Sequence, residues 1–161
     1  MVRAARKRPD ALFIGLDADP SRMRRASRHA PANALFVVAA AEAVPTELDG
    51  MVARVSIHFP WGSLLRGLVA PTAEVLGGIA RSLRPDGTLT ALLSIGERDG
   101  AQPLGPGSID RAAYRRRGLE VTEWRLATPA EIELSDSSWA KRLRTSPARS
   151  VWHLGASRLW R

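Results

Sequence analysis

Two aromatic motifs and an acidic residue have the types and spacing that a binding or catalytic site would use. The first motif is Phe59-Pro60-Trp61-Gly62. Proline fixes φ and glycine permits close backbone approach, so this step would present a rigid apolar turn against which a nucleic-acid base could lie. A core tryptophan in a tight turn explains the same residues equally well.

The second motif, residues 137–144, places Trp139 among basic side chains. Aromatic and cationic residues together are typical of nucleic-acid contacts, since bases stack on rings and phosphates pair with cations. The same spacing also fits an amphipathic helix that buries Trp139 and Leu143 on one face. Both interpretations stay open on this motif alone.

Asp17 follows the apolar run 11–16, and Ala41-Glu42 follow the apolar run 34–39. Such runs are typical of parallel strands buried on both faces, and ligands bind beyond the carboxyl ends of these strands. A carboxylate there can accept hydrogen bonds from ribose hydroxyls, and a loop there can lie against adenine. The alternatives are a turn or cap residue for Asp17 and a solvated loop for residues 41–42.

The elements that must position these residues alternate between strand and helix in the first part of the chain. Asp19 and Pro20 predict the start of a helix that runs to about His29, and Thr72 predicts the cap of a helix that runs to about Leu83. A further helix is expected at 63–69, and strands at 11–16, 34–39, 52–59 and 88–94. This alternation predicts a doubly wound α/β sheet.

The last third of the chain does not continue this regular alternation of strand and helix. Ser108 is expected to cap a helix through Arg117 that stops at Gly118. Strands at 119–127 and 151–159, separated by a loop and a short helix within 135–143, predict an antiparallel edge on the parallel sheet. We interpret the remaining tryptophans as core or edge packing: Trp124, Trp152 and Trp160.

The composition is that of a soluble globular protein, with 161 residues, 25% charged and 45% hydrophobic side chains. The chain has no cysteine, which excludes disulfides and thiolate metal sites, and its three histidines show no metal-binding spacing. Its formal charge of +8 comes mainly from clustered arginines. Composition alone fits either an arginine-rich proteome or a polyanionic partner, and the clustering favours the polyanionic partner.

Together these motifs resemble the aminoglycoside-resistance methyltransferases that modify 16S rRNA at N1 of adenine 1408. The Phe-Pro-Trp-Gly step and the Trp-Ala-Lys-Arg-Leu stretch are distinctive, whereas the Leu-Arg-Pro-Asp-Gly turn occurs in many class I methyltransferases. The matching segments follow the family's order and cover nearly the whole chain: 13–18, 40–45, 59–66, 83–87 and 138–143.

The resemblance implies a single Rossmann-like class I domain over residues 1–161 that uses S-adenosyl-L-methionine. Trp61 and Trp139 would sandwich the target base after it leaves its stack. Asp17 would hold the cofactor ribose, and Ala41 and Glu42 would flank its adenine. Further cofactor contacts are implied for Pro60, Ser63 and Ser137. Phosphate contacts are implied for Lys141, Arg142, Arg144 and Arg149.

The sequence departs from the family at its beginning. Family members start with a strand and a Gly-x-Gly-x-Gly turn beneath the methionine part of the cofactor, and no segment here matches them. We therefore expect an N-terminally incomplete domain that lacks a central strand, through either a misassigned start codon or a truncated gene. Weak cofactor binding is expected for the same reason.

The expected partner is 16S rRNA in the small (30S) ribosomal subunit, and the expected state is a cytoplasmic monomer with no metal and no membrane contact. A non-catalytic rRNA-binding protein derived from a methyltransferase is the main alternative function. An unrelated nucleotide-binding fragment would retain Asp17 but gives no reason for the motif at 59–62.

Overall fold

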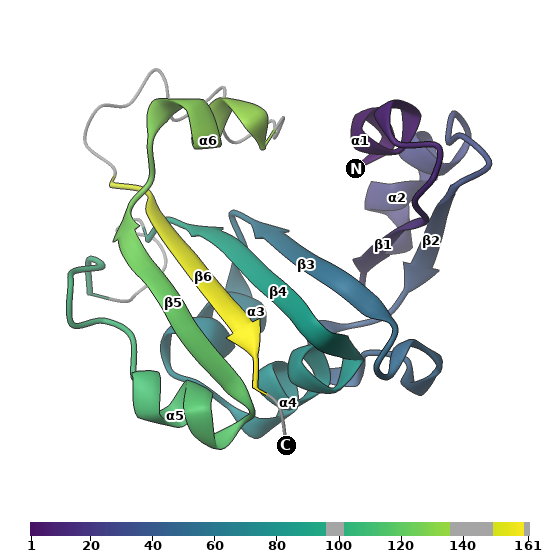
Figure 1. Ribbon diagram of the computed structural model, residues 1–161. Helices are drawn as coiled ribbons and strands as arrows, with labels where there is room; N and C mark the ends of the chain where they lie inside the picture. Colours follow the sequence, from purple (N-terminus) through teal and green to yellow (C-terminus); the bar gives the residue numbers. More distant parts are fainter. Residues whose placement is uncertain (96–101, 136–149, 160–161) are drawn as a thin grey trace. The chain divides into compact units, whose positions relative to one another are not determined.

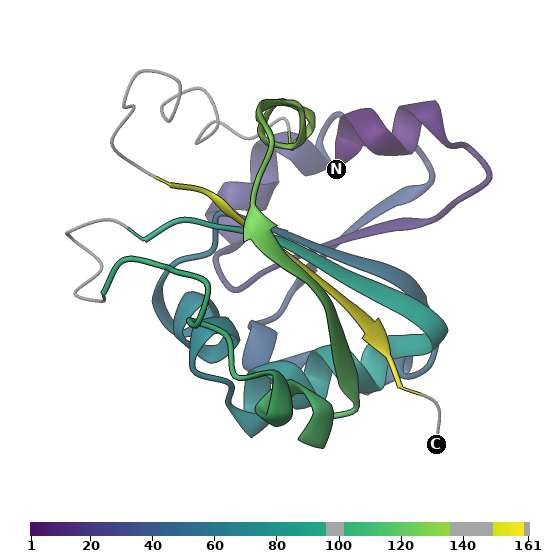
Figure 2. The ribbon, with the colours of Figure 1, turned by 60° about the vertical axis from the view of Figure 1, so that its left-hand side comes forward.

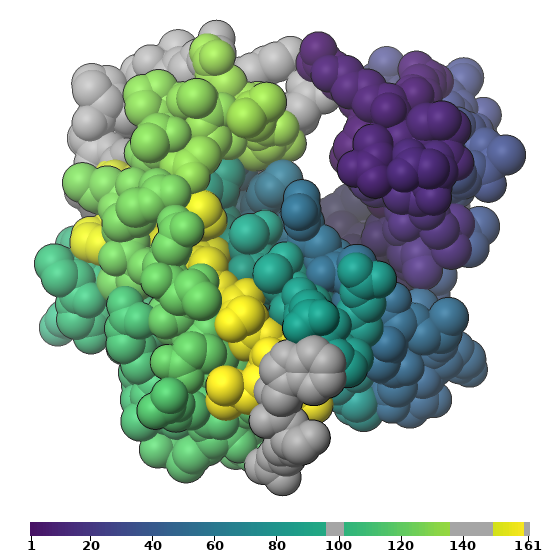
Figure 3. All heavy atoms as spheres, viewed as in Figure 1, coloured from purple at the N-terminus to yellow at the C-terminus, as the bar shows by residue number. Residues whose placement is uncertain are grey.

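The computed structural model describes residues 1–95, 102–135 and 150–159, which are coloured along the sequence in Figure 1 and Figure 3. Contacts within the chain divide it into two compact units, Met1–Pro45 and Thr46–Arg161. Each unit has its own β-sheet, with two strands in the first and four in the second.

The first unit is a parallel strand pair with two helices. In β1 and β2, Phe13 lies opposite Ala34 and Asp17 opposite Val38. The elements of this unit are α1 (Val2–Lys7), β1 (Phe13–Asp17), α2 (Pro20–Ser27), β2 (Ala34–Val38) and the 3₁₀ turn η1 (Ala41–Ala43).

Side-chain hydrogen bonds fix the connections of this unit. Asp19 caps α2, because its Oδ1 accepts a hydrogen bond from the Ser21 amide at 2.9 Å, and Pro20 occupies the first turn. The Asn33 side-chain nitrogen donates hydrogen bonds of 2.8–3.0 Å to three carbonyl oxygens, one within α1 and two between α1 and β1. The helix expected after Asp19 is thereby confirmed, with its cap.

The second unit is a four-stranded sheet in the order β3-β4-β6-β5. Strands β3 and β4 are parallel, and β6 is antiparallel to both of its neighbours. Helices α3, α4 and α5 lie on one side of the sheet (Figure 2). The elements are η2 (Thr46–Leu48), β3 (Val52–His58), α3 (Gly62–Val69), α4 (Ala73–Ser82), β4 (Leu83–Leu93), α5 (Arg111–Arg116), β5 (Leu119–Leu126), α6 (Pro129–Leu134) and β6 (Trp152–Arg158).

The core of this unit lies between the sheet and these helices. Leu68 of α3, Leu76 of α4 and Leu154 of β6 are fully buried there. Tyr114 of α5 is also fully buried, and its hydroxyl donates a hydrogen bond to the Leu68 carbonyl at 2.8 Å. Burial raises the pKa of this hydroxyl, so it stays protonated and links α5 to α3.

The α/β class and the antiparallel edge are confirmed. The last described strand, β6, is inserted between β4 and β5, and among the described strands of this four-stranded sheet it alone is reversed. Within the described residues, β1 pairs only with β2, and β3 pairs only with β4. The described strands therefore form two separate sheets.

In the last third, one local prediction was wrong and one helix was missed. Ser108 does not cap α5, because its hydroxyl accepts a hydrogen bond from Gly105, and Asp110 caps the helix through the Ala113 amide at 2.9 Å. Helix α6 was missed, although Thr128 and Glu131 form a reciprocal capping box that the pattern Thr-x-x-Glu indicates.

Candidate functional site

The aromatic turn after β3 is held by its backbone. Phe59 has a φ of 51°, a left-handed conformation that few residues other than glycine adopt. Its amide donates a hydrogen bond to the Leu92 carbonyl at 2.8 Å, and its ring packs with Leu92 and Val151. Contacts with β4 and with the residue before β6 therefore stabilise this conformation.

The same turn presents Trp61 outward. Gly62 has a φ of 63°, which L-residues rarely adopt, and Trp61 is the N-cap residue of α3 in extended conformation. The Trp61 side chain is 63% exposed, whereas Pro60 is buried and Ser63 is exposed in the first turn of α3. This exposure does not fit the core tryptophan of the alternative interpretation.

Several other chain segments end at this edge of the sheet. Trp152, the first residue of β6, lies opposite both Leu93 of β4 and Leu126 of β5. Its ring stacks on Trp124 with centroids 4.8 Å apart, which confirms the packing interpretation of both tryptophans. The Ser94 hydroxyl follows β4 and is buried without a hydrogen-bond partner among the residues described, a polar group that sequence reasoning missed.

Both neighbours of segment 136–149 are anchored at this edge. On one side, Ile132 of α6 packs against the cluster of Phe59, Leu92 and Val151. On the other side, Val151 belongs to that cluster. The second aromatic motif and its predicted site residues lie outside the described residues: Ser137, Trp139, Lys141, Arg142, Arg144 and Arg149.

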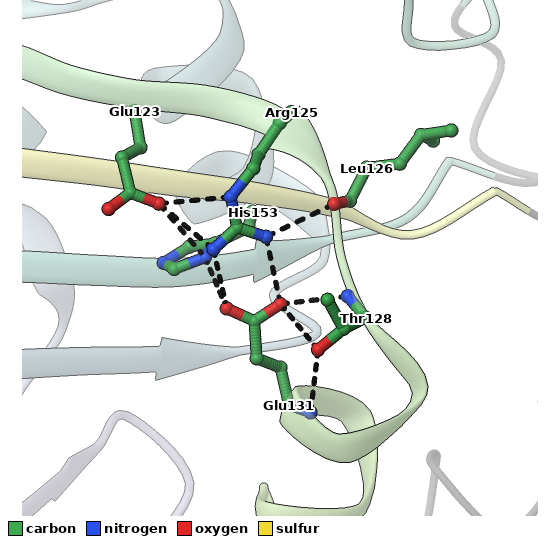
Figure 4. A network of polar contacts seen from close by, with 6 residues as sticks. All are labelled: Glu123, Arg125, Leu126, Thr128, Glu131 and His153. Atoms are coloured by element: carbon green, nitrogen blue, oxygen red, sulfur yellow. Dashed lines mark hydrogen bonds and ion pairs between the residues drawn. The ribbon is translucent and has the colours of Figure 1, made fainter.

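A polar network fixes α6 to the strands (Figure 4). Both Glu131 carboxylate oxygens pair with the Arg125 guanidinium, at 2.7 and 2.9 Å. Glu131 Oε1 also lies 2.8 Å from His153 Nδ1, and Oε2 accepts a hydrogen bond from the Thr128 amide. The hydrogen bond from Arg125 is the main reason that the pKa of Glu131 lies well below its usual value.

In the first unit, three predicted cofactor residues follow the ends of the parallel strands. Asp17 ends β1 and is half-buried, and its Oδ1 accepts a hydrogen bond from the Asp19 amide at 2.9 Å. The Ala39 amide donates to the Asp17 carbonyl, which joins the segment before η1 to the end of β1. Ala41 opens η1 and is half-buried, and Glu42 beside it is exposed.

The polar groups of Asp17 and of residues 41–42 fit the adenosine part of S-adenosyl-L-methionine. An ionised carboxylate has two acceptor oxygens, and the amide contact of Asp17 uses one position on Oδ1, which leaves acceptor capacity for ribose hydroxyls. Ala41 and Glu42 would supply a surface and a polar group if an adenine ring were bound there. The sequence has no counterpart of the Gly-rich turn for the methionine part.

Comparison with known proteins identifies the family. The family profile described as NpmA: 16S rRNA (adenine(1408)-N(1))-methyltransferase matches residues 1–158. The chain belongs to this 16S rRNA (adenine(1408)-N(1))-methyltransferase family. The enzyme of that name from Streptoalloteichus hindustanus is 33% identical over 168 residues, covering 91% of this chain and 76% of the relative.

Solved structures of this methyltransferase family have the same fold. The 16S rRNA methyltransferase KamB is 30% identical with a TM-score of 0.83, covering 99% of this chain and 82% of that protein. A 16S rRNA (adenine(1408)-N(1))-methyltransferase variant from Catenulisporales acidiphilia, solved with its cosubstrate SAM, is 28% identical with a TM-score of 0.83. The alignment covers 99% of this chain and 80% of that variant.

The described parts of this methyltransferase chain contain neither a metal-binding cluster nor a membrane-spanning helix. No group of three or more His, Asp or Glu residues there could hold a metal ion. None of the described helices is both long enough and apolar enough to cross a membrane.

Proposed function

We propose that this chain carries the function of its family, methylation of 16S rRNA at N1 of adenine 1408 with S-adenosyl-L-methionine, and thereby aminoglycoside resistance. The observation that carries the proposal is Trp61. This indole is exposed at the carboxyl end of β3, on a turn fixed by Phe59 and Gly62. It lies where ligands of α/β sheets bind.

The chemistry requires positioning more than acid–base groups. When bound, S-adenosyl-L-methionine supplies a methyl group on a sulfonium centre. Adenine N1 has a lone pair and no proton, so no side chain has to remove one before attack. The chain's task is to hold a base that has left its stack, and stacking on Trp61 and Trp139 contributes roughly 1–3 kcal/mol per ring.

The partner we propose is the small (30S) subunit, bound by a monomer in the cytoplasm. Lys141, Arg142, Arg144 and Arg149 would contact phosphates, in line with the net charge of +8. Asp17, Ala41, Glu42, Pro60, Ser63 and Ser137 would hold the cofactor.

A methyl-transfer assay tests this function. Small subunits are incubated with the chain and methyl-labelled cofactor, and the modified nucleotide is located in the rRNA. Label at adenine 1408 supports the proposal. Label elsewhere contradicts the target, and no label with retained subunit binding supports the alternative below.

The alternative is rRNA binding without catalysis. It is favoured by one specific observation, since β1 and β3 each pair with a single strand within the described residues, and the sequence has no Gly-rich turn. Such a protein would bind small subunits with a steep salt dependence, because phosphate contacts release counterions. It would transfer no methyl group.

A further inference from the structure

A basic hollow lies at the opposite end of the sheet from Trp61. It has a volume of about 240 Å³ and opens widely to solvent. It is lined by the second half of α4, the end of α5 with the two residues after it, and the last residue of β6. Figure 1 shows where these elements lie. Four of its lining residues are arginines: Arg81, Arg116, Arg117 and Arg158.

The positive charge of this hollow is only partly neutralised. Arg81 pairs with Asp49 at 2.7 Å, and Arg116 lies 3.7 Å from Asp110. Arg158 donates a hydrogen bond to the neutral Gly118 carbonyl at 3.4 Å. Among the described residues, the Arg117 side chain has no ion pair or hydrogen bond.

Two of these arginines lie where a helix end favours a positive charge. Arg81 lies in the last turn of α4, and Arg116 lies in the last turn of α5. Cations are favourable there because the carbonyl end of a helix carries partial negative charge. Arg117 and Arg158 have no carboxylate partner among the residues described. The positive charges of these two guanidinium groups are therefore not neutralised by a described carboxylate, which favours the binding of an anion in the hollow.

We infer that this hollow binds a backbone phosphate of the substrate RNA, a contact remote from the methylated base; the inference rests on the proposed function. Guanidinium groups suit this ligand because they donate two parallel hydrogen bonds to phosphate oxygens. Phosphate contacts fix the position and register of a protein on nucleic acid without reading the sequence.

The position of the hollow explains what it contributes. β6 runs from Trp152, at the edge near Trp61, to Arg158 in the hollow. Six residue steps at about 3.3 Å each separate these ends by about 20 Å. A contact at that distance cannot touch the target base, so it orients the folded RNA as a rigid body.

Arg117→Gln tests the inference in the 161-residue chain. Its side chain has no described partner to lose, so the variant should unfold at the wild-type temperature. We expect roughly tenfold weaker binding to small subunits, as for loss of one charge-assisted hydrogen-bonding group. The slope of log affinity against log salt should become shallower by about 0.7–0.9. Arg117→Lys, which keeps the charge, should restore most of the slope.

Arg54→Gln is the matched control, since Arg54 is exposed on β3 and does not line the hollow. It removes the same charge and should leave the slope unchanged. Equal effects of the two variants would overturn the inference. Failure of the wild-type chain to bind small subunits would overturn the proposed function and this inference with it.

Inorganic phosphate distinguishes RNA from a free anion. At equal ionic strength, phosphate should inhibit small-subunit binding by the wild type more than chloride does. The difference between the two anions should be smaller for Arg117→Gln. If phosphate protects only the wild type from thermal unfolding, while both proteins bind subunits equally, the hollow serves a free anion and the RNA contact is wrong.

Discussion

At the scale of single residues, Trp61 owes its orientation to the backbone around it. Phe59 and Gly62 both have positive φ, and the amide of Phe59 is bonded to β4. The sequence predicted the rigid turn from Pro60 and Gly62. It could not predict the exposure of Trp61, because exposure depends on where Leu92 and Val151 pack against Phe59.

In a version extended by the family's first strand and Gly-rich turn, Trp61→Ala should lower methyl transfer while leaving cofactor affinity within about twofold. Loss of one stacking ring costs roughly 1–3 kcal/mol, which corresponds to about 5- to 150-fold in kcat/KM. Initial rates on small subunits give the first quantity, and calorimetry gives the second. Met51→Ala is the control, since Met51 is 71% exposed before the start of β3, at the other end of this strand. Equal losses of turnover and cofactor binding would mark Trp61 as structural.

Gly62→Ala should cost about 1 kcal/mol of unfolding free energy, because alanine is strained at a φ of 63°. No atom lies within 4 Å of the position its Cβ would take, so the cost is conformational. Gly77→Ala is the matched comparison, since Gly77 in α4 has equal space and no positive φ. There the change should stabilise the chain by about 0.5–1 kcal/mol. Urea denaturation measures both, and shifts of the same sign would contradict this account.

At the scale of elements, α6 shows how a short helix is fixed by polar contacts. It has six residues, and Glu131 joins its first turn to Arg125 of β5 and His153 of β6. Thr128 and Glu131 were visible in the sequence as a capping box, but Arg125 and His153 come together only through the β5–β6 register. The cap at Asp110 was missed for a related reason, because Ser108 and Asp110 are both good caps and the Gly105 contact decides between them.

Glu131→Gln should lower the unfolding free energy by about 1 kcal/mol at pH 7, since it removes a partly exposed ion pair and weakens a cap. The pKa of Glu131 is lowered in the folded chain, so its stabilisation is present above the ordinary value of 4.5. It is lost as pH falls below that value toward the folded pKa. Denaturation at several pH values should therefore show the two proteins converging in acid. Glu47→Gln, an exposed change in η2, should show no such trend. A constant difference at all pH values would contradict the ionic explanation.

At the scale of the whole molecule, local patterns predicted most of the elements but only part of the pairing. The apolar runs at 11–16 and 34–39 became β1 and β2, and Asp19 and Thr72 cap the helices expected of them. The insertion of β6 between β4 and β5 is a long-range choice that no local pattern encodes. The binding roles expected for the second aromatic motif, residues 137–144, stay a prediction because these residues lie outside the described parts of the chain.

The 161-residue chain should bind S-adenosyl-L-methionine weakly, with no saturable heat below about 1 mM in calorimetry. Asp17 can serve the ribose, but the sequence supplies no backbone cradle for the methionine end. The unpaired edges of β1 and β3 also leave backbone groups without strand partners in the described residues. Adenosine, which lacks the methionine part, should bind no more than a few-fold more weakly. Micromolar affinity for the full cofactor would contradict this prediction.

The place of β6 has a consequence for biosynthesis. A chain emerges from the ribosome beginning at its N-terminus, and β6 follows every other described strand in the sequence while lying between two of them. Until residues 152–158 leave the exit tunnel, β4 and β5 cannot be joined, and each offers an open edge to other nascent chains. Folding of the second unit therefore waits until β6 has left the exit tunnel, and the open edges of β4 and β5 need chaperone protection until then.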